Sequence, residues 1–514
     1  MAKDYSEKNK RIAKNAVFLY FRMFVSMAIS FFTSRVVLQA LGVEDFGVFN
    51  VVGSVIVMVG TLTGALGAAT GRYLTYGIGL KDLKRAQVIF STAFYIHLTL
   101  SILFVLVAET LGLWVVNTQL NIPEGRMFAA NIVYQVSIFS AALGMTQAPY
   151  GACMSAHEHF GIVAYFSIAD SVIKLLIAYA TLYSSFDHLI FYATLYIMRS
   201  VMFRIIYRVY CIRKFQEAHL IRVHDWTLVR GMLSFSGLSA FSSIAGVTYG
   251  QGITWLVNRF FGVAVNAASG VAMQVQGILY SFIQNVTSAF RPQIIKEYAC
   301  KDYDRVQQLV LTGTKISSGM ILLPTIPVVI NIDYLMSLWL EEVPPMAPVI
   351  CQIYLIKNVF NCLNPLPSNG VTASGKIKDV SLLSALMYLI TLGIVYVAIK
   401  LTHSVVATFL CELILPAATG FLYAYYLRKY MPAFSIRKYY FGTVAPLYIS
   451  AFLSIFATIT LCRGIEGKLS YFIVTSVVSL VLTAALVYGL VFDKNSRRVV
   501  NEYVTKKLKK HRTT

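Results

Sequence analysis

The sequence predicts an all-α polytopic membrane protein with about fourteen transmembrane helices. Of its 514 residues, 57% are hydrophobic and only 13% are charged, whereas about a quarter of the residues in a soluble domain are charged. The apolar residues form runs long enough for a helix to cross a hydrocarbon core of roughly 30 Å, which takes about 20 residues. A transmembrane barrel would show short segments of alternating polarity instead.

Fourteen apolar segments follow one another along the chain, separated by polar or charged stretches. The polar start MAKDYSEKNKRIAKNA leads directly into a full span, so we expect the first helix to act as an uncleaved insertion signal. The expected helices cover residues 12–40, 47–71, 87–116, 127–152, 160–183, 188–211, 228–260, 263–290, 306–331, 347–372, 379–400, 404–427, 438–461 and 469–492.

The distribution of basic residues predicts the orientation. On this helix map, 33 of the 44 Lys and Arg residues fall on the side of the N-terminus, 5 on the other side and 6 within helices. The positive-inside rule therefore places both termini in the cytoplasm. The net charge of +21 is spread over many loops, whereas a nucleic-acid-binding protein gathers its basic residues on one face. We expect membrane lipids, and no nucleic acid, as partners.

An internal repeat divides the chain. KDLKRAQ (81–87) returns as KDYDRVQ (301–307), and the same offset of 220 residues carries Gly42 onto Gly262. The positive-inside rule explains why both loops are basic, but it does not explain the conserved spacing. An even number of helices per copy gives both copies one orientation, so the repeat predicts an axis along the membrane normal and a central cavity.

The repeat extends further, because PYGACMSAHEH (149–159) resembles SNGVTASGKIK (368–378) at an offset of 219 residues. Helices 1 to 6 then correspond to helices 7 to 12, and the last two helices stand outside the repeat. The expected parts are two six-helix lobes, two additional helices and a basic cytoplasmic tail, at residues 1–215, 216–430, 431–492 and 493–514.

Four stretches carry a resemblance to a known family: GVEDFGVFN, GRYLTYGIGLKD, RPQIIKEYACKD and NGVTASGKIKD, at 42–50, 71–82, 291–302 and 369–379. The chain resembles the Wzx-type polysaccharide repeat-unit flippases of the multidrug, oligosaccharidyl-lipid and polysaccharide exporter superfamily. The resemblance implies two lobes in a V shape, with helices 1, 2, 7 and 8 lining the cavity. It also implies transport of a polyprenyl-diphosphate-linked oligosaccharide to the outer leaflet of a bacterial inner membrane, beside other membrane proteins of polysaccharide assembly.

Basic residues inside the expected helices are candidate ligands for the diphosphate, because a buried cation is costly and usually faces a cavity. Arginine can bind phosphate oxygens through two parallel hydrogen bonds. We expect substrate binding by Arg22, Arg35, Arg259 and Lys357. Arg35 and Arg259 could equally extend to the outer interface, as long basic side chains do. The helix of Lys357 is rich in Asn and Pro, so we expect it to be broken.

Two acids could couple transport to an ion gradient. Asp170 and Lys174 lie four residues apart on one helix face, and Arg199 is expected at a similar depth. A structural ion pair is one interpretation, and the other is that Asp170 or Glu412 binds a proton or sodium ion. Helix 263–290 contains Gln274, Gln276, Gln284 and Asn285, which suit sugar hydroxyls or helix packing equally well.

Two other functions, a glycosyltransferase and a multidrug exporter, are alternatives to the flippase. Glu44 and Asp45 would suit a glycosyltransferase using a prenyl-linked donor, but they also suit a capped turn, and we expect no catalytic residue. A multidrug exporter of the same superfamily would favour an acidic, aromatic cavity. The seven cysteines show no paired spacing, and His157 and His159 point to different helix faces, so we expect neither disulfides nor a metal cofactor.

Overall fold

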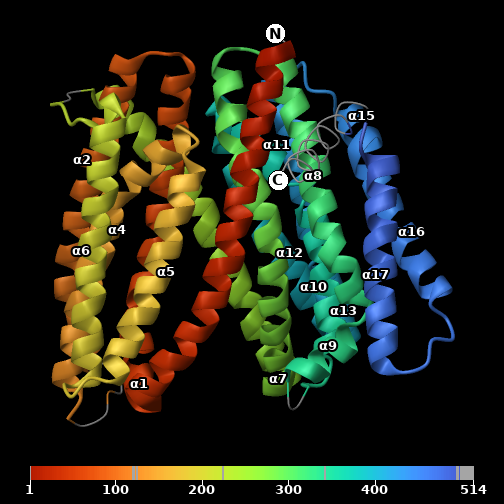
Figure 1. Ribbon diagram of the computed structural model, residues 1–514, viewed down its shortest axis with the longest axis horizontal. Coiled ribbons are helices and arrows are strands. Elements are labelled where there is room, and N and C mark those ends of the chain that lie inside the picture. Colours follow the sequence, from red (N-terminus) through yellow and green to blue (C-terminus); the bar gives the residue numbers. More distant parts are fainter. Residues whose placement is uncertain are drawn as a thin grey trace, which may run out of the picture. The chain divides into compact units, whose positions relative to one another are not determined.

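The structure is a computed structural model that describes residues 2–118, 122, 125–222, 225–340, 343–493 and 497. Every regular element within these residues is helical (Figure 1), which confirms the all-α fold class. The chain forms two compact units, one of residues 17–243 and one of residues 1–16 with 244–514. Most of the expected basic tail, 494–496 and 498–514, lies outside the described residues.

Within the described residues, eleven helical segments are long and apolar enough to cross a membrane. The three remaining expected spans are 47–71, 263–290 and 347–372, of which the last is interrupted. The elements of the first half are α1 (Ala2–Gly79), α2 (Leu83–Val107), η1 (Ala108–Gly112), α3 (Leu113–Thr118), α4 (Met127–Ala156), α5 (Phe160–Leu182), α6 (His188–Lys214) and η2 (Gln216–Ala218).

The second half begins with α7 (Trp226–Ala299), which runs from one compact unit into the other. It continues with α8 (Tyr303–Ile330), α9 (Ile332–Trp339), α10 (Ala347–Asn361), α11 (Pro365–Ser374), α12 (Lys378–Thr402), α13 (Val405–Cys411), α14 (Ile414–Tyr430), α15 (Ile436–Tyr439), η3 (Tyr440–Val444), α16 (Ala445–Leu461), α17 (Lys468–Leu486) and η4 (Val487–Val491). The short helix α9 was not expected from the sequence.

Two glycines at equivalent places in the repeat bend the two longest helices. Gly42 in α1 has φ 71° and ψ 172°, and Gly262 in α7 has φ 83° and ψ −178°. This region of backbone conformation is open essentially to glycine alone. The 220-residue offset found in the sequence therefore joins two positions with the same unusual backbone geometry.

The KD turns also match in detail. Lys81 and Lys301 both have a left-handed backbone, with φ 57° and 60°. The next residues, Asp82 and Asp302, cap the N-termini of α2 and α8, each accepting a hydrogen bond from the backbone N–H three residues later, at 2.9 and 3.1 Å. An N-cap carboxylate satisfies an amide that the helix leaves unpaired. The motif is thus a helix stop followed at once by a helix start.

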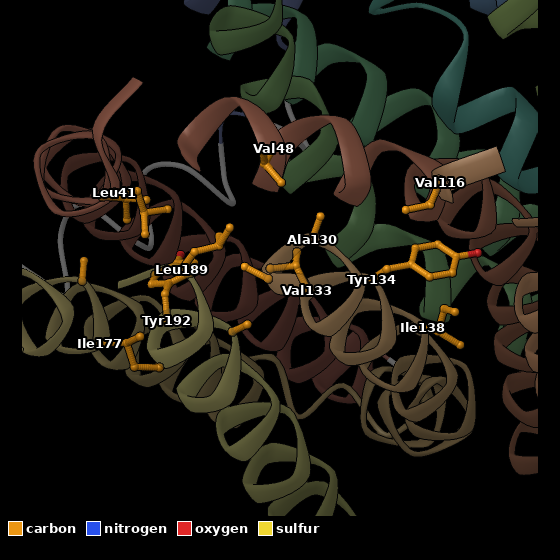
Figure 2. Packing of buried hydrophobic residues seen from close by; sticks show 14 of the residues in the cluster. Leu41, Val48, Val116, Ala130, Val133, Tyr134, Ile138, Ile177, Leu189 and Tyr192 are labelled. Carbon is orange, nitrogen blue, oxygen red and sulfur yellow. The ribbon is translucent and has the colours of Figure 1, made fainter. Parts of the chain in front are cut away.

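The unit of residues 17–243 has its main apolar core between α4, α5 and α6, with the bend of α1 packed against them (Figure 2). Figure 1 shows α2, α4 and α6 side by side. Tyr134 is fully buried here, and its hydroxyl donates to the carbonyl of Ala108 at 2.8 Å. A Cβ at Gly112 would lie 1.9 Å from that hydroxyl. The close approach of the ring requires glycine at this position.

The last two long helices, α16 and α17, belong to the other unit and join through small polar residues. The hydroxyls of Ser454 and Thr483 hydrogen-bond at 2.6 Å, and Thr475 donates to the side chain of Asn331, beyond the end of α8, at 3.1 Å. Figure 1 shows α8, α16 and α17 together. Small residues and hydrogen bonds of this kind hold helices together in lipid, where apolar contacts give little preference.

Candidate functional site

The unit of residues 1–16 with 244–514 contains two helices that are interrupted at the same site. The first interruption separates α10 from α11, as expected from the sequence. Pro365 has no N–H to continue the helix, and the chain tightens there, with the amide of Asn364 donating to the carbonyl of Asn361 at 3.2 Å. The side chain of Asn364 then donates to the hydroxyl of Thr419 at 3.0 Å and to the carbonyl of Pro416 at 3.2 Å.

The second interruption corrects the sequence prediction, which drew one unbroken helix over 404–427. The helix stops at Cys411 and restarts as α14 at Ile414, so Glu412 lies in the gap. The physical reason is Pro416, which cannot donate to the carbonyl of Glu412 four residues earlier. The amide of Glu412 instead donates to the carbonyl of Phe409, three residues back, at 3.2 Å.

An ion pair connects the elements at these interruptions. Lys357 of α10 donates to the carboxylate of Glu412, and the side chains are 13% and 3% exposed. Tyr249 of α7 and Tyr354 of α10 also donate to Glu412, at 3.3 and 3.5 Å. The Lys357 ammonium lies 5.2 Å from the centre of the Tyr354 ring. Glu412 therefore has one cation and two hydroxyl donors, which together offset the loss of its hydration.

A cavity of about 540 Å³ opens beside this pair, with walls from α7, α10, α11, α12 and α14. Its walls carry hydroxyl, amide and basic groups, and none of the described residues that line it is acidic. The residues that give it this character are Tyr249, Tyr280, Tyr388, Tyr423, Gln276, Gln284, Thr287, Ser288, Asn361, Asn364, Ser368, Asn369, Thr419, Arg291 and Lys357.

Arg291 is the charged residue of this cavity that the sequence prediction missed. It was assigned to a cytoplasmic loop because the apolar run ends at residue 290, but α7 continues to Ala299 and holds Arg291 in the cavity wall. Unlike Lys357, Arg291 has no hydrogen-bond or ion-pair partner among the described residues. An unpaired guanidinium in a polar cavity is available to an anionic ligand.

The polar residues of the α7 segment 263–290 separate into two groups. Gln276 and Gln284 line the cavity, and Gln276 also exchanges hydrogen bonds with Asn358 at 2.9 and 3.3 Å. Asn285 is buried and donates to the carbonyl of Ser281 at 2.9 Å. Gln276 therefore joins α7 to α10, and contact of these side chains with sugar hydroxyls stays a prediction.

A second ionic group lies in the unit of residues 17–243. Asp170 of α5 binds the ammonium of Lys174 at 2.7 Å and accepts a hydrogen bond from Arg199 of α6. The Arg199 guanidinium lies 4.3 Å from the centre of the Tyr196 ring. Asp170 thus joins α5 to α6 with two cations for one acid.

The other expected substrate ligands are distributed along the chain. Arg22 is half-buried on α1, and Tyr207 of α6 lies close enough to interact electrostatically with both Arg22 and Asp170. Arg35 is exposed, and the thirteen helical steps from Arg22 to Arg35 turn an ideal helix by about 220° beyond full turns, which places the two on different faces. Arg259 is exposed on α7 and does not line the cavity of its unit.

Asp45 has a structural partner at the bend of α1. Arg126 donates to Asp45 and also to Asp187 at 2.6 Å, and Asp187 caps the N-terminus of α6. These bonds lower the pKa of the Asp187 carboxyl and raise the pKa of the Arg126 guanidinium. The side chain of Glu44 lies outside the described residues. Asp45, Arg126 and Asp187 thus form a clamp of three residues that joins the bend of α1 to the start of α6.

Several solved structures of membrane transporters have a fold similar to that of this chain. The structure of the MATE transporter ClbM in complex with Rb⁺ superposes with a TM-score of 0.72 at 16% identity, over 84% of this chain and 96% of ClbM. The chain has the fold of MATE transporters. A MATE in complex with MaD3S gives a TM-score of 0.73 at 12% identity, over 83% of this chain and 97% of that one. Residues 231–397 match the MatE family model, and no curated protein sequence matches the chain.

A further MATE-fold neighbour is a MOP superfamily transporter from Pyrococcus furiosus. It superposes with a TM-score of 0.71 at 13% identity, over 82% of this chain and 96% of that one. Its binding pocket is described as having reverse polarity, which suggests a different function. The all-α membrane fold expected from the sequence agrees with the fold of these structures, and the segment that matches the MatE model contains Tyr249, Arg291 and Lys357 of the cavity.

Proposed function

We propose that the protein is a membrane transporter that moves a polyprenyl-diphosphate-linked oligosaccharide from the cytoplasmic to the outer leaflet by alternating access. Such a substrate presents a negatively charged diphosphate and many hydroxyl groups. The cavity in the unit of residues 1–16 with 244–514 offers matching chemistry, with cationic, amide and hydroxyl groups in its walls. The observation that carries the proposal is Arg291, a cation that lines the cavity without a partner among the described residues.

A multidrug exporter is the second candidate, and the solved neighbours favour it. One of them is an outward-facing multidrug resistance MATE transporter, with a TM-score of 0.69 at 14% identity. An organic cation is best held by an unpaired acid or by open aromatic faces. Glu412, the acid that contacts the cavity residues Lys357 and Tyr249, is bonded to both of them and to Tyr354. The charge of the cavity therefore supports an anionic substrate over a cationic one.

A glycosyltransferase finds less support. Of the two expected acids, Glu44 and Asp45, the second forms the clamp with Arg126 and Asp187, where it cannot act as a free base. Solved proteins that share this fold are described as transporters, which supports a transporter over an enzyme. The proposed location is the bacterial cytoplasmic membrane, with both termini inside.

The proposed transport can be driven by an ion gradient if Asp170 or Glu412 binds a proton or sodium ion. Each of these acids forms an ion pair with a basic side chain in this structure. If Asp170 carries the coupling proton or sodium ion, Asp170→Asn should abolish the ion dependence of transport and leave substrate binding in place. If Asp170 only joins α5 to α6, the variant should lose stability and keep the ion dependence.

The decisive experiment is reconstitution of the purified protein in proteoliposomes with a fluorescent polyprenyl-diphosphate oligosaccharide. Lipid moved across the bilayer is detected by a membrane-impermeant quencher. Arg291→Gln should slow this movement about 10-fold or more, because a charged hydrogen bond contributes about 1.5–3 kcal/mol. Arg230→Gln is the matched control, since Arg230 is an exposed arginine on the same helix α7.

Transport of an organic-cation dye by the same vesicles, without movement of the lipid, would overturn the proposal in favour of a drug exporter. Equal rates for Arg291→Gln and Arg230→Gln would remove the cavity from the pathway. In cells, deletion of the gene should accumulate the lipid-linked oligosaccharide in the cytoplasmic leaflet.

A further inference from the structure

Three side chains with metal-binding chemistry meet where α4 and α6 end. Cys153 and His157 lie four residues apart on α4 and so share one helix face. Glu217 comes from η2, the turn that follows α6. The Cys153 thiol lies 3.8 Å from the Glu217 carboxylate, which is also hydrogen-bonded to the His157 imidazole. The three ligand atoms all lie within 4.8 Å of one another.

This cluster is enclosed and held in place by its surroundings. Cys153 and Glu217 are almost completely buried, whereas His157 is 25% exposed and keeps one edge open to solvent. The His157 ring stacks on Phe215 with 4.3 Å between centroids and an angle of 12° between planes, which fixes its orientation. A carboxylate buried to this degree requires a compensating cation. A protonated histidine can supply that charge, and so can a metal ion.

One of the separations already suits a small tetrahedral ion. Zinc binds thiolate sulfur at about 2.3 Å and imidazole nitrogen or carboxylate oxygen at about 2.0–2.2 Å, so its ligands stand roughly 3.3–3.8 Å apart. The distance from Cys153 to Glu217 already falls within this interval. The contact between His157 and Glu217 is a direct hydrogen bond, and an ion would replace the proton between them. The mixture of thiolate, imidazole and carboxylate favours Zn²⁺ over Mg²⁺ or Ca²⁺.

We propose that Cys153, His157 and Glu217 form a Zn²⁺ site that ties the end of α4 to the end of α6. Binding requires the Cys153 thiol to lose its proton and the His157 nitrogen that faces the ion to carry none. The fourth position is filled by water, through the side of the cluster where His157 is open to solvent. The site lies on the side that the charge pattern predicts to be cytoplasmic, and it is independent of the proposed transport function.

The sequence did not predict this site, and the reason is geometric. The sequence prediction weighed His157 and His159, which are two residues apart and point to different helix faces, so they cannot bind one ion together. The true set combines a C-x3-H spacing on a helix with an acid 60 residues away in sequence. The His159 ring is engaged elsewhere, with its Nδ1 at 2.8 Å from the Tyr210 hydroxyl.

The test uses the full-length protein in detergent, treated with a chelator and then freed of it. Co²⁺ is titrated in, because it takes zinc sites and its bond to thiolate gives an absorption band that a nitrogen or oxygen ligand does not. We expect one Co²⁺ per chain with this band, and its displacement by Zn²⁺. Cys153→Ser should abolish the band. His157→Gln and Glu217→Gln should each weaken binding by at least about 100-fold, since even outer-shell changes cost 10–100-fold.

Two matched controls lie outside the cluster. Cys300 is an exposed thiol on the loop between α7 and α8, and His219 is an exposed histidine two residues after Glu217. Cys300→Ser and His219→Gln should bind Co²⁺ like the original protein. Gel filtration checks that every variant is folded, and Zn²⁺ should raise the thermal stability of the original protein but not of Cys153→Ser. A folded protein without the thiolate band, or a band lost only in Cys300→Ser, would overturn the proposal.

Discussion

The ion pair between Lys357 and Glu412 should be strongly coupled, and a double-mutant cycle measures this. Removing one partner of a buried pair costs about 3–5 kcal/mol, because the other charge is left without compensation. Tyr249 and Tyr354 still donate to Glu412 when Lys357 is replaced, so we expect Lys357→Met at the lower end of that range. With Glu412→Gln as the second change, the expected coupling free energy is about 2–3 kcal/mol, near the upper end for residues in contact.

The assay is unfolding of the purified protein by SDS in mixed micelles, followed for both single variants and the double variant. The control cycle uses Lys429 and Asp379, a pair at 3.6 Å whose side chains are about half exposed. Exposed pairs contribute about 0–1 kcal/mol, so this second coupling should be below 1 kcal/mol. Equal coupling in the two cycles would refute the view that burial makes the Lys357 pair strong.

Two further predictions concern the bend positions and the clamp. Gly42→Ala and Gly262→Ala should each reduce the free energy of unfolding by about 1–3 kcal/mol, because alanine avoids this region of backbone conformation. Gly270 is the control, since it has open space around it and no positive φ, and Gly270→Ala should not have this effect. Equal losses in all three variants would disprove the role of the bends. Arg126 lowers the pKa of Asp187, so this stabilisation is complete above the unfolded pKa of about 3.9 and is lost as pH falls through the lower folded value. Arg126→Gln should therefore reduce stability near neutral pH and flatten its acid dependence in thermal unfolding, and an unchanged acid profile would contradict the clamp.

The helical fold could be predicted largely from the sequence, because in lipid each span must satisfy its own backbone hydrogen bonds. The repeat could be found for a related reason. A helix stop, a capped start and a glycine bend require particular residues at fixed spacing, so Gly42, Lys81 and Asp82 recur as Gly262, Lys301 and Asp302. The apolar stretches between these positions need only be hydrophobic, so they do not require the same residue at the same position in both copies of the repeat.

The site was less predictable, because it depends on where helices end and which faces meet. Hydropathy ended a span at residue 290 and so placed Arg291 in a loop, although the helix continues beyond it. Lys357 and Glu412 were each identified as buried charges, but nothing in the spacing of 55 residues indicates that they are partners. The break at Glu412 depends on Pro416, a signal that the sequence contains and that a search for apolar runs overlooks.

The charge of the cavity links the double-mutant cycle to the choice of substrate. Arg291 and Lys357 line the cavity, and Glu412 compensates only Lys357. An organic cation that needs Glu412 must first displace Lys357 and so gives up the coupling free energy of the pair. At about 2–3 kcal/mol this lowers the affinity of such a cation by about 30- to 150-fold, since 1.4 kcal/mol is a factor of ten. An anionic diphosphate meets Arg291 without that cost, so a strong coupling favours the lipid-linked substrate and a negligible one restores the drug exporter.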